Sequence, residues 1–142
     1  MTRLRFRLAA PALVAAGIAM LFAASASASR APTTKEQKGI ANAVLATHVA
    51  GLNTVPRSHY RVTGERVSSV SGSWAKAEVV ARPAYRSTFQ NASVVAVRLA
   101  GTSQWVVVDL GSAQVGCGIA PNKVLADLFS TKTPCPPGTG IG

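Results

Sequence analysis

Residues that supply metal ligands and general acids or bases are scarce in this sequence. Its 142 residues include five Asp and Glu, two His and two Cys, and the acids are scattered along the chain. A metal site needs several such ligands close together. A serine hydrolase needs a nucleophile, a histidine and an acid around a turn such as G-x-S-x-G, and that motif is absent. We therefore expect no metal, no cofactor and no catalytic residue.

Long basic runs are also absent, because the fifteen Lys and Arg residues are distributed evenly. Runs of five or more like charges are typical of interaction tails that bind nucleic acid, and the chain carries no recognisable nucleic-acid-binding module. We expect no nucleic-acid partner.

The first 28 residues have the layout of a secretory signal peptide. Arg3, Arg5 and Arg7 precede an uncharged apolar run over residues 8–24, and alternating Ala and Ser follow. The A-x-A site at residues 26–28 predicts cleavage between Ala28 and Ser29, and the site at residues 24–26 is an alternative. The apolar run is shorter than the about 20 residues of a membrane span. We expect cleavage, no stable membrane anchor, and a secreted or cell-envelope protein.

The net charge of the remaining chain is strongly positive. Residues 29–142 keep twelve Lys and Arg against all five acids, a charge of +7 on 114 residues. Such a charge favours anionic partners outside the cell, such as wall polymers or lipid headgroups, although a solvated surface that maintains solubility is an alternative reading. The abundance of Ala, Val, Arg and Gly is typical of a GC-rich bacterial genome.

Cys117 and Cys135 are the only cysteines. In an oxidising compartment an isolated pair usually forms a disulfide. Closing this loop is worth about 3 kcal/mol in the chain-entropy model. The spacing is not C-x-x-C, and the two histidines lie far upstream, so we expect a structural disulfide.

Hydrophobic periodicity predicts two helices and four strands between them. A helix is expected over residues 35–51, capped by Thr33 or Thr34. Alternating patterns predict strands over 74–82, 93–100 and 104–110, and one strand or a bent pair over 59–70. A short helix is expected to begin at Pro121. The expected fold is α+β, with the N-terminal helix packed on a four-stranded antiparallel sheet, a short C-terminal helix and one disulfide.

The expected domain organisation is simple. Residues 29–33 form a leader, residues 34–135 form one domain, and residues 136–142 form a flexible tail rich in Pro and Gly.

One set of aromatic and basic residues is a candidate binding face. If the strands pair as expected, one sheet face carries Tyr60, Trp74, Lys76, Arg98 and Trp105. Aromatic and cationic groups together suit sugars or anionic polymers, whereas ordinary packing under the helix is the alternative.

The order of elements resembles that of small secreted bacterial proteins of unknown function. The features that carry this resemblance are the first helix, Ser73-Trp74-Ala75, Trp105-Val106-Val107-Val108, Cys117, Pro121 and Cys135. The layout also resembles the cystatin-like and NTF2-like α+β folds over residues 34–135. The cystatin motif Q-x-V-x-G is absent, and Gln114-Val115-Gly116 echoes only part of it. The resemblance implies an α+β fold and carries over no functional residue, because such folds host enzymes, inhibitors and binding modules alike.

Three functions are consistent with these observations. The leading hypothesis is a non-enzymatic binding or interaction module at the cell envelope or in the medium, whose partner is an anionic cell-envelope polymer or a secreted protein. The second is a small hydrolase that uses His59 and Asp109, although an ion pair is the simpler role for Asp109. The third is a secreted protease inhibitor. Asp127, in the last helix, is expected to face solvent.

Overall fold

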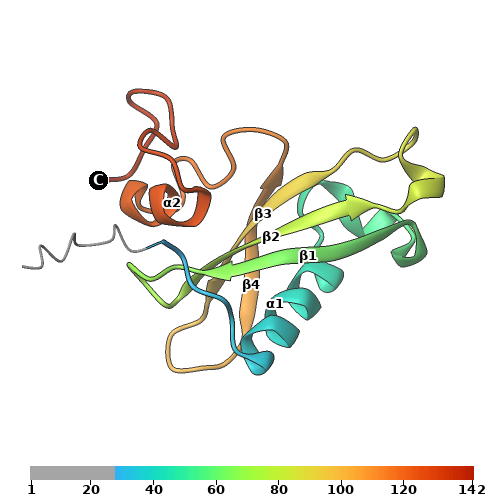
Figure 1. Cartoon of the computed structure of the whole chain (residues 1–142), viewed down its shortest axis with the longest axis horizontal. Coiled ribbons are helices and arrows are strands. Elements are labelled where there is room, and N and C mark those ends of the chain that lie inside the picture. Colours follow the sequence, from blue (N-terminus) through green and yellow to red (C-terminus); the bar gives the residue numbers. More distant parts are fainter. Residues whose placement is uncertain (1–27) are drawn as a thin grey trace, which may run out of the picture.

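A computed structural model describes residues 28–142, so the expected signal peptide, apart from its last residue, lies outside the described part of the chain. Figure 1 shows helix α1 (Thr34–Ala46), strands β1 (Tyr60–Val67), β2 (Trp74–Ala81), β3 (Ala92–Arg98) and β4 (Trp105–Gly111), and helix α2 (Asn122–Phe129). The short 3-10 helices η1 (Val49–Thr54), η2 (Arg57–His59) and η3 (Pro83–Tyr85) lie in the connections. The predicted α+β fold is confirmed.

Helix α1 begins at a capping box, as its sequence predicts. The Thr33 hydroxyl accepts the Glu36 N–H at 3.3 Å, and the Glu36 carboxylate accepts the Thr33 N–H at 2.8 Å. Arg30 forms an ion pair with Glu36 at 2.7 Å. This hydrogen bond from Arg30 lowers the pKa of Glu36 to about 2, so the carboxylate is charged at neutral pH.

The predicted end of this helix at residue 51 is wrong. α1 ends at Ala46, because the Thr47 hydroxyl accepts the Val49 N–H at 3.2 Å and competes with continuation of the helix. Ala50 and Gly51 then adopt positive φ angles of 49° and 72°, which lie outside right-handed helical geometry and form a kink within η1.

The four strands form an antiparallel meander in chain order, and α1 covers one face of it (Figure 1). Ile40 and Val44 of α1 are fully buried against a sheet face that carries several alanines, among them Ala75, Ala77 and Ala96. Small side chains in the sheet let the helix approach closely, and their burial supplies hydrophobic free energy at about 25 cal/mol per Å².

Helix α2 covers part of the opposite face. Leu125 packs with Val95, Val115 and Ala120 in a second, smaller core cluster. The predicted disulfide between Cys117 and Cys135 is present, and it joins the loop before α2 to the segment after it. Within residues 28–142 no helix is long and apolar enough to cross a membrane.

The last residues of the chain contact the start of α2. The Ile141 carbonyl accepts the Asn122 N–H at 2.8 Å. The expected flexibility of residues 136–142 stays a prediction.

Candidate binding site beside the second helix

The candidate binding-face residues lie on both faces of the sheet. Tyr60 and Trp105 are buried in the core beneath α1, and the Arg98 guanidinium lies 5.8 Å from the centre of the Trp105 ring. Trp74 packs in the α2 cluster, and Lys76 is 5.1 Å from the ring centre of Phe129 in that same cluster. The structure therefore does not bring the five residues together.

Strand register explains this division. Trp74 pairs with Val97, and Arg98 pairs with Trp105. Neighbouring residues of a strand point to opposite faces, so Val97 lies on the face of Trp74 while Arg98 points to the other face. Tyr60 and Trp105 contribute to the hydrophobic core, as most buried aromatic residues do.

His59 and Asp109 are separated by the width of the sheet. His59 precedes β1 and Asp109 lies in β4, the two edge strands, with β2 and β3 between them. The His59 ring stacks on Tyr85 with 3.7 Å between ring centres. The Asp109 carboxylate accepts the N–H groups of Leu110 and Gly116 at 2.8 and 2.6 Å, so the expected ion pair of Asp109 is replaced by backbone hydrogen bonds.

No group of three His, Cys, Asp or Glu side chains that could hold a metal ion occurs within residues 28–142.

Asp127 joins α2 to the turn that follows β1. Its carboxylate accepts the Ser68 hydroxyl at 2.7 Å, the Ser69 N–H at 2.8 Å and the Ser69 hydroxyl at 3.0 Å. Asp127 is 8 % exposed and Ser68 is 1 % exposed. The expectation that Asp127 faces solvent is therefore wrong, because the turn after β1 covers it and satisfies its oxygens.

The same contacts end strand β1 earlier than its pattern predicts. The strand was expected to reach residue 70 and ends at Val67. The Ser68 hydroxyl accepts the Val70 and Ser71 N–H groups at 3.2 Å while it donates to Asp127. Serine hydroxyls that bind nearby backbone groups favour turns over strands.

Asp127 is ionised in this setting. Burial raises the pKa of its carboxyl group, but the hydrogen bonds from Ser68 and Ser69 stabilise the charged form and outweigh burial, so the pKa lies below its ordinary value. In the described part of the chain the only ion pair joins Arg30 and Glu36, so Asp127 carries a buried negative charge without a cationic side-chain partner.

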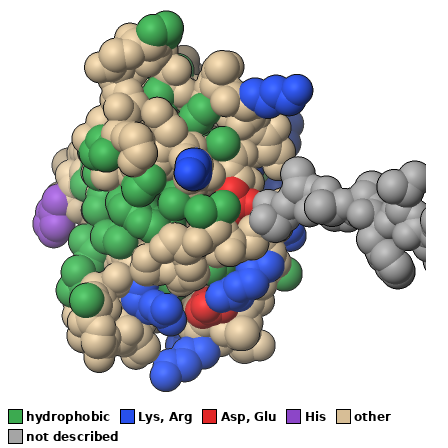
Figure 2. All heavy atoms as spheres, turned by 90° about the vertical axis from the view of Figure 1, so that its left-hand side faces the viewer, with side chains coloured by type: hydrophobic (Ala, Val, Ile, Leu, Met, Phe, Trp, Pro, Cys, Tyr) green, Lys and Arg blue, Asp and Glu red, His purple; other side chains and the backbone are tan. Residues whose placement is uncertain are grey.

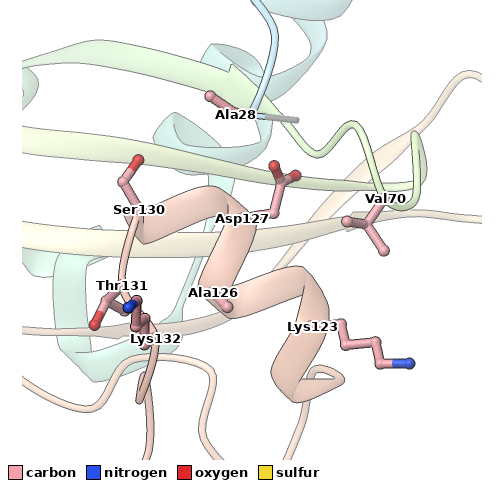
Figure 3. A pocket seen from close by; sticks show the side chains of 8 residues that line it. All are labelled: Ala28, Val70, Lys123, Ala126, Asp127, Ser130, Thr131 and Lys132. Carbon is pink, nitrogen blue, oxygen red and sulfur yellow. The ribbon is translucent and has the colours of Figure 1, made fainter. Parts of the chain in front are cut away.

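A cavity lies beside this contact. It has a volume of about 580 Å³, in the range of small-molecule sites. Figure 3 shows its wall, which combines apolar, hydroxyl and charged side chains: Ala28, Val70, Lys123, Ala126, Asp127, Ser130, Thr131 and Lys132.

Lys123 and Lys132 are the cations of this wall. Both are exposed, and Lys123 extends from α2 while Lys132 follows its end (Figure 3). Neither forms an ion pair with a described residue. A neighbouring cavity of about 260 Å³ also has Lys123, Ala126 and Lys132 in its wall, so both lysines line both cavities.

The arrangement suits anion binding. Figure 3 shows Lys123 and Lys132 extending on different sides of α2, so their ammonium groups can contact separate phosphate or carboxylate groups of an extended polyanion, while Ala126 and Val70 offer apolar surface. Asp127 keeps its negative charge and so repels an anion placed beside it, but its oxygens are occupied by Ser68 and Ser69 and do not pair with the lysines. Neither histidine lines this wall, so it offers no imidazole base.

A second surface is apolar. Trp74, Val97 and Val106 occupy paired positions of β2, β3 and β4 and so form a row on the α2 side of the sheet. Val106 is 37 % exposed, and Leu99 after β3 is 42 % exposed. Figure 2 shows hydrophobic side chains gathered on one face of the molecule, with Lys and Arg mostly to the right of them and below. Exposed apolar patches of this kind mark contact surfaces.

Comparisons with protein-family models, with curated proteins and with solved structures found no match to this chain. The resemblance in element order therefore carries no functional residue, and function is argued from the site.

The lysines and serines of this site are absent from the residues predicted from sequence. Asp127 carries a signal that could have located it, since it follows Val124 by three residues and so lies on the buried stripe of α2. Lys123 and Lys132 carry none, because isolated lysines are ordinary surface residues.

Proposed function

We propose that the chain is exported, cleaved after Ala28, and acts outside the cytoplasm as a non-enzymatic module that binds an anionic polymer of the cell envelope beside α2. The observation that carries this proposal is the pair of exposed lysines, Lys123 and Lys132, that form no ion pair with a described residue and line the cavity beside α2, whose only carboxylate is held by serines. The charge of +7 on residues 29–142 adds long-range attraction to such a polymer.

The electrostatic part of this proposal predicts salt-dependent binding. Cationic side chains that bind polyanions release counterions, so affinity falls as salt rises. A specific site adds to the affinity through direct contacts of Lys123 and Lys132, which lysines elsewhere on the surface do not make. The two contributions are separable with variants that carry the same net charge.

The test measures binding of the chain 29–142 to a purified phosphate-bearing wall polymer, with polyglutamate as a carboxylate probe. The site variant is Lys123→Gln with Lys132→Gln. The control is Lys35→Gln with Lys38→Gln, which removes the same charge from the exposed surface of α1.

We expect the site variant to lose about tenfold in affinity, equivalent to about 1.4 kcal/mol, and the control to lose two- to threefold. Equal losses in both variants would show that only net charge matters. Absence of binding to either polymer at low salt would overturn the proposal.

Export has its own measurement. Expressed in a secreting bacterium, the chain is expected in the wall or medium fraction with a mass that begins at Ser29. Retention of residues 1–28 on the recovered protein would contradict cleavage.

A secreted protein is a second candidate partner, favoured by the partly exposed apolar row of Trp74, Val97 and Val106. Burial of apolar surface is insensitive to moderate salt. A pull-down from the secreted fraction that survives high salt, and that Val106→Lys abolishes, would favour this partner. The protease-inhibitor hypothesis stays a prediction, and residual protease activity in the presence of the chain tests it.

A further inference from the structure

The residue expected to become the N-terminus is buried in the fold. Ser29 is 4 % exposed. Beside it, Arg30 forms an antiparallel bridge with Val67, in which the Arg30 N–H donates to the Val67 carbonyl at 2.8 Å and the Val67 N–H donates to the Arg30 carbonyl at 3.0 Å. In this register Ser29 lies opposite Ser68, the residue whose hydroxyl binds Asp127.

A second contact holds Ser29 in place. The Arg66 guanidinium donates to the Ser29 carbonyl, and its Nε lies 3.4 Å from the Ser29 hydroxyl. The carbonyl and side chain of Ser29 are therefore bound from the side of β1, and its nitrogen continues toward Ala28.

That nitrogen leads into the surroundings of Asp127, because Ser29 lies opposite Ser68 and the Ser68 hydroxyl binds the Asp127 carboxylate at 2.7 Å. Ala28 and Asp127 line the same cavity, and the Ser29 nitrogen is bonded to the Ala28 carbonyl carbon. Figure 3 shows the Asp127 carboxylate pointing from α2 toward the side on which Ala28 lies. Hydrogen bonds already stabilise this carboxylate, and no cationic side chain in the described part of the chain pairs with it, so an ammonium group within reach would add a charge–charge interaction.

The geometry points to a maturation latch: cleavage between Ala28 and Ser29 creates an α-ammonium group on Ser29 that forms an ion pair with Asp127. This inference rests on the proposed export and cleavage, and it adds a structural role for the new terminus. The latch would join three segments, namely the N-terminal segment, the turn after β1, and α2 with its cavity wall.

The chemistry is an ordinary amide hydrolysis. Water breaks the C–N bond, its oxygen remains on the Ala28 carbonyl carbon as a carboxylate, and both hydrogens end on the Ser29 nitrogen, which becomes –NH₃⁺. Residues 1–28 leave with the carboxylate. Before cleavage the same nitrogen is a neutral amide, so the uncleaved chain lacks the ion pair and is less stable, which suits export of an unfolded chain.

The test compares two chains that differ only at the terminal nitrogen. One begins at Ser29 with a free amine, released from a fusion by a protease that leaves no extra residue, and the other is N-acetylated on Ser29. Each is prepared with Asp127, with Asp127→Asn, and with the control Glu65→Gln, which removes a carboxylate elsewhere in β1.

We expect acetylation to lower Tm by about 4 °C in the Asp127 and Glu65→Gln chains, and to change it little in the Asp127→Asn chain. An equal shift in all three chains, or no shift in any, would overturn the latch. If Asp127→Asn does not fold, NMR titration of the Ser29 amine decides: a pKa raised above the ordinary value of about 7.7–8.0 supports the pair, and an ordinary value refutes it.

These outcomes are distinct from those of the proposed function. Loss of polymer binding would leave the Tm comparison unaffected. An exported protein that begins at Ser27 would overturn the latch while export and polymer binding still hold.

Discussion

Gly116 offers a sharp test of how α2 meets the sheet. Its φ is +84°, and a Cβ added there would lie 2.7 Å from Leu125 Cδ2 and 3.1 Å from Val95 Cγ2. Gly116→Ala therefore combines two costs. The left-handed backbone costs an alanine about 1 kcal/mol, and crowding against a packed core costs about 2 kcal/mol more. We expect a loss of about 3 kcal/mol in the free energy of unfolding.

Gly138 provides the matched control. Its φ of +83° is nearly the same, but nothing lies within 4 Å of an added Cβ. Gly138→Ala should therefore lose only the backbone part, about 1 kcal/mol or less. Urea unfolding of residues 29–142, followed by tryptophan fluorescence, measures both. Equal losses would mean that Leu125 and Val95 do not enclose Gly116, and the described position of α2 would be refuted.

Three further outcomes are expected. Gly39→Ala gains about 1 kcal/mol in helix propensity, but its Cβ would lie 2.8 Å from Cδ1 of the rigid Trp105 ring, so its urea midpoint should fall despite that gain. Replacing Cys117 and Cys135 by Ser should remove about 3 kcal/mol of stability, read from the same unfolding curves. Because the folded pKa of Glu36 is about 2, its contribution to stability is present above about pH 4.3 and lost as pH falls toward 2, and Glu36→Gln should flatten stability curves in that range.

Much of the fold was predictable because its signals are local. The Thr33 cap and the alternation of β2 depend on residues close in sequence. The disulfide follows from there being only two cysteines, whatever the fold. Local patterns also predicted the wrong C-terminal end for α1 and for β1. The Thr47 hydroxyl ends α1 early, and the Ser68 hydroxyl ends β1 early, because each binds nearby backbone N–H groups.

Strand register placed the predicted binding-face residues on both faces of the sheet, because Trp74 pairs with Val97 while Arg98 pairs with Trp105. An irregularity elsewhere in β4 produced a second difference from simple alternation. The pairing of β3 with β4 shifts between Val95 and Ala96, so that Val95 pairs with Asp109 and Ala96 with Val107. After this irregularity Leu110 packs with the α1 core, although simple alternation groups it with Val106. A β-bulge costs little free energy, and no residue pattern in this sequence indicates its position. Beyond a bulge, alternation therefore assigns residues to the wrong face of the sheet.

The sequence by itself determined the elements, their order, the antiparallel α+β class and the disulfide. Periodicity and caps are local signals, and a single pair of cysteines leaves only one possible disulfide. Only the tertiary structure decided which side chains meet. Asp127 reaches Ser68 across 59 positions of sequence, and the cavity with Lys123 and Lys132 exists because α2 docks beside the turn after β1. Such contacts depend on how two faces pack, and packing is a property of the whole folded chain.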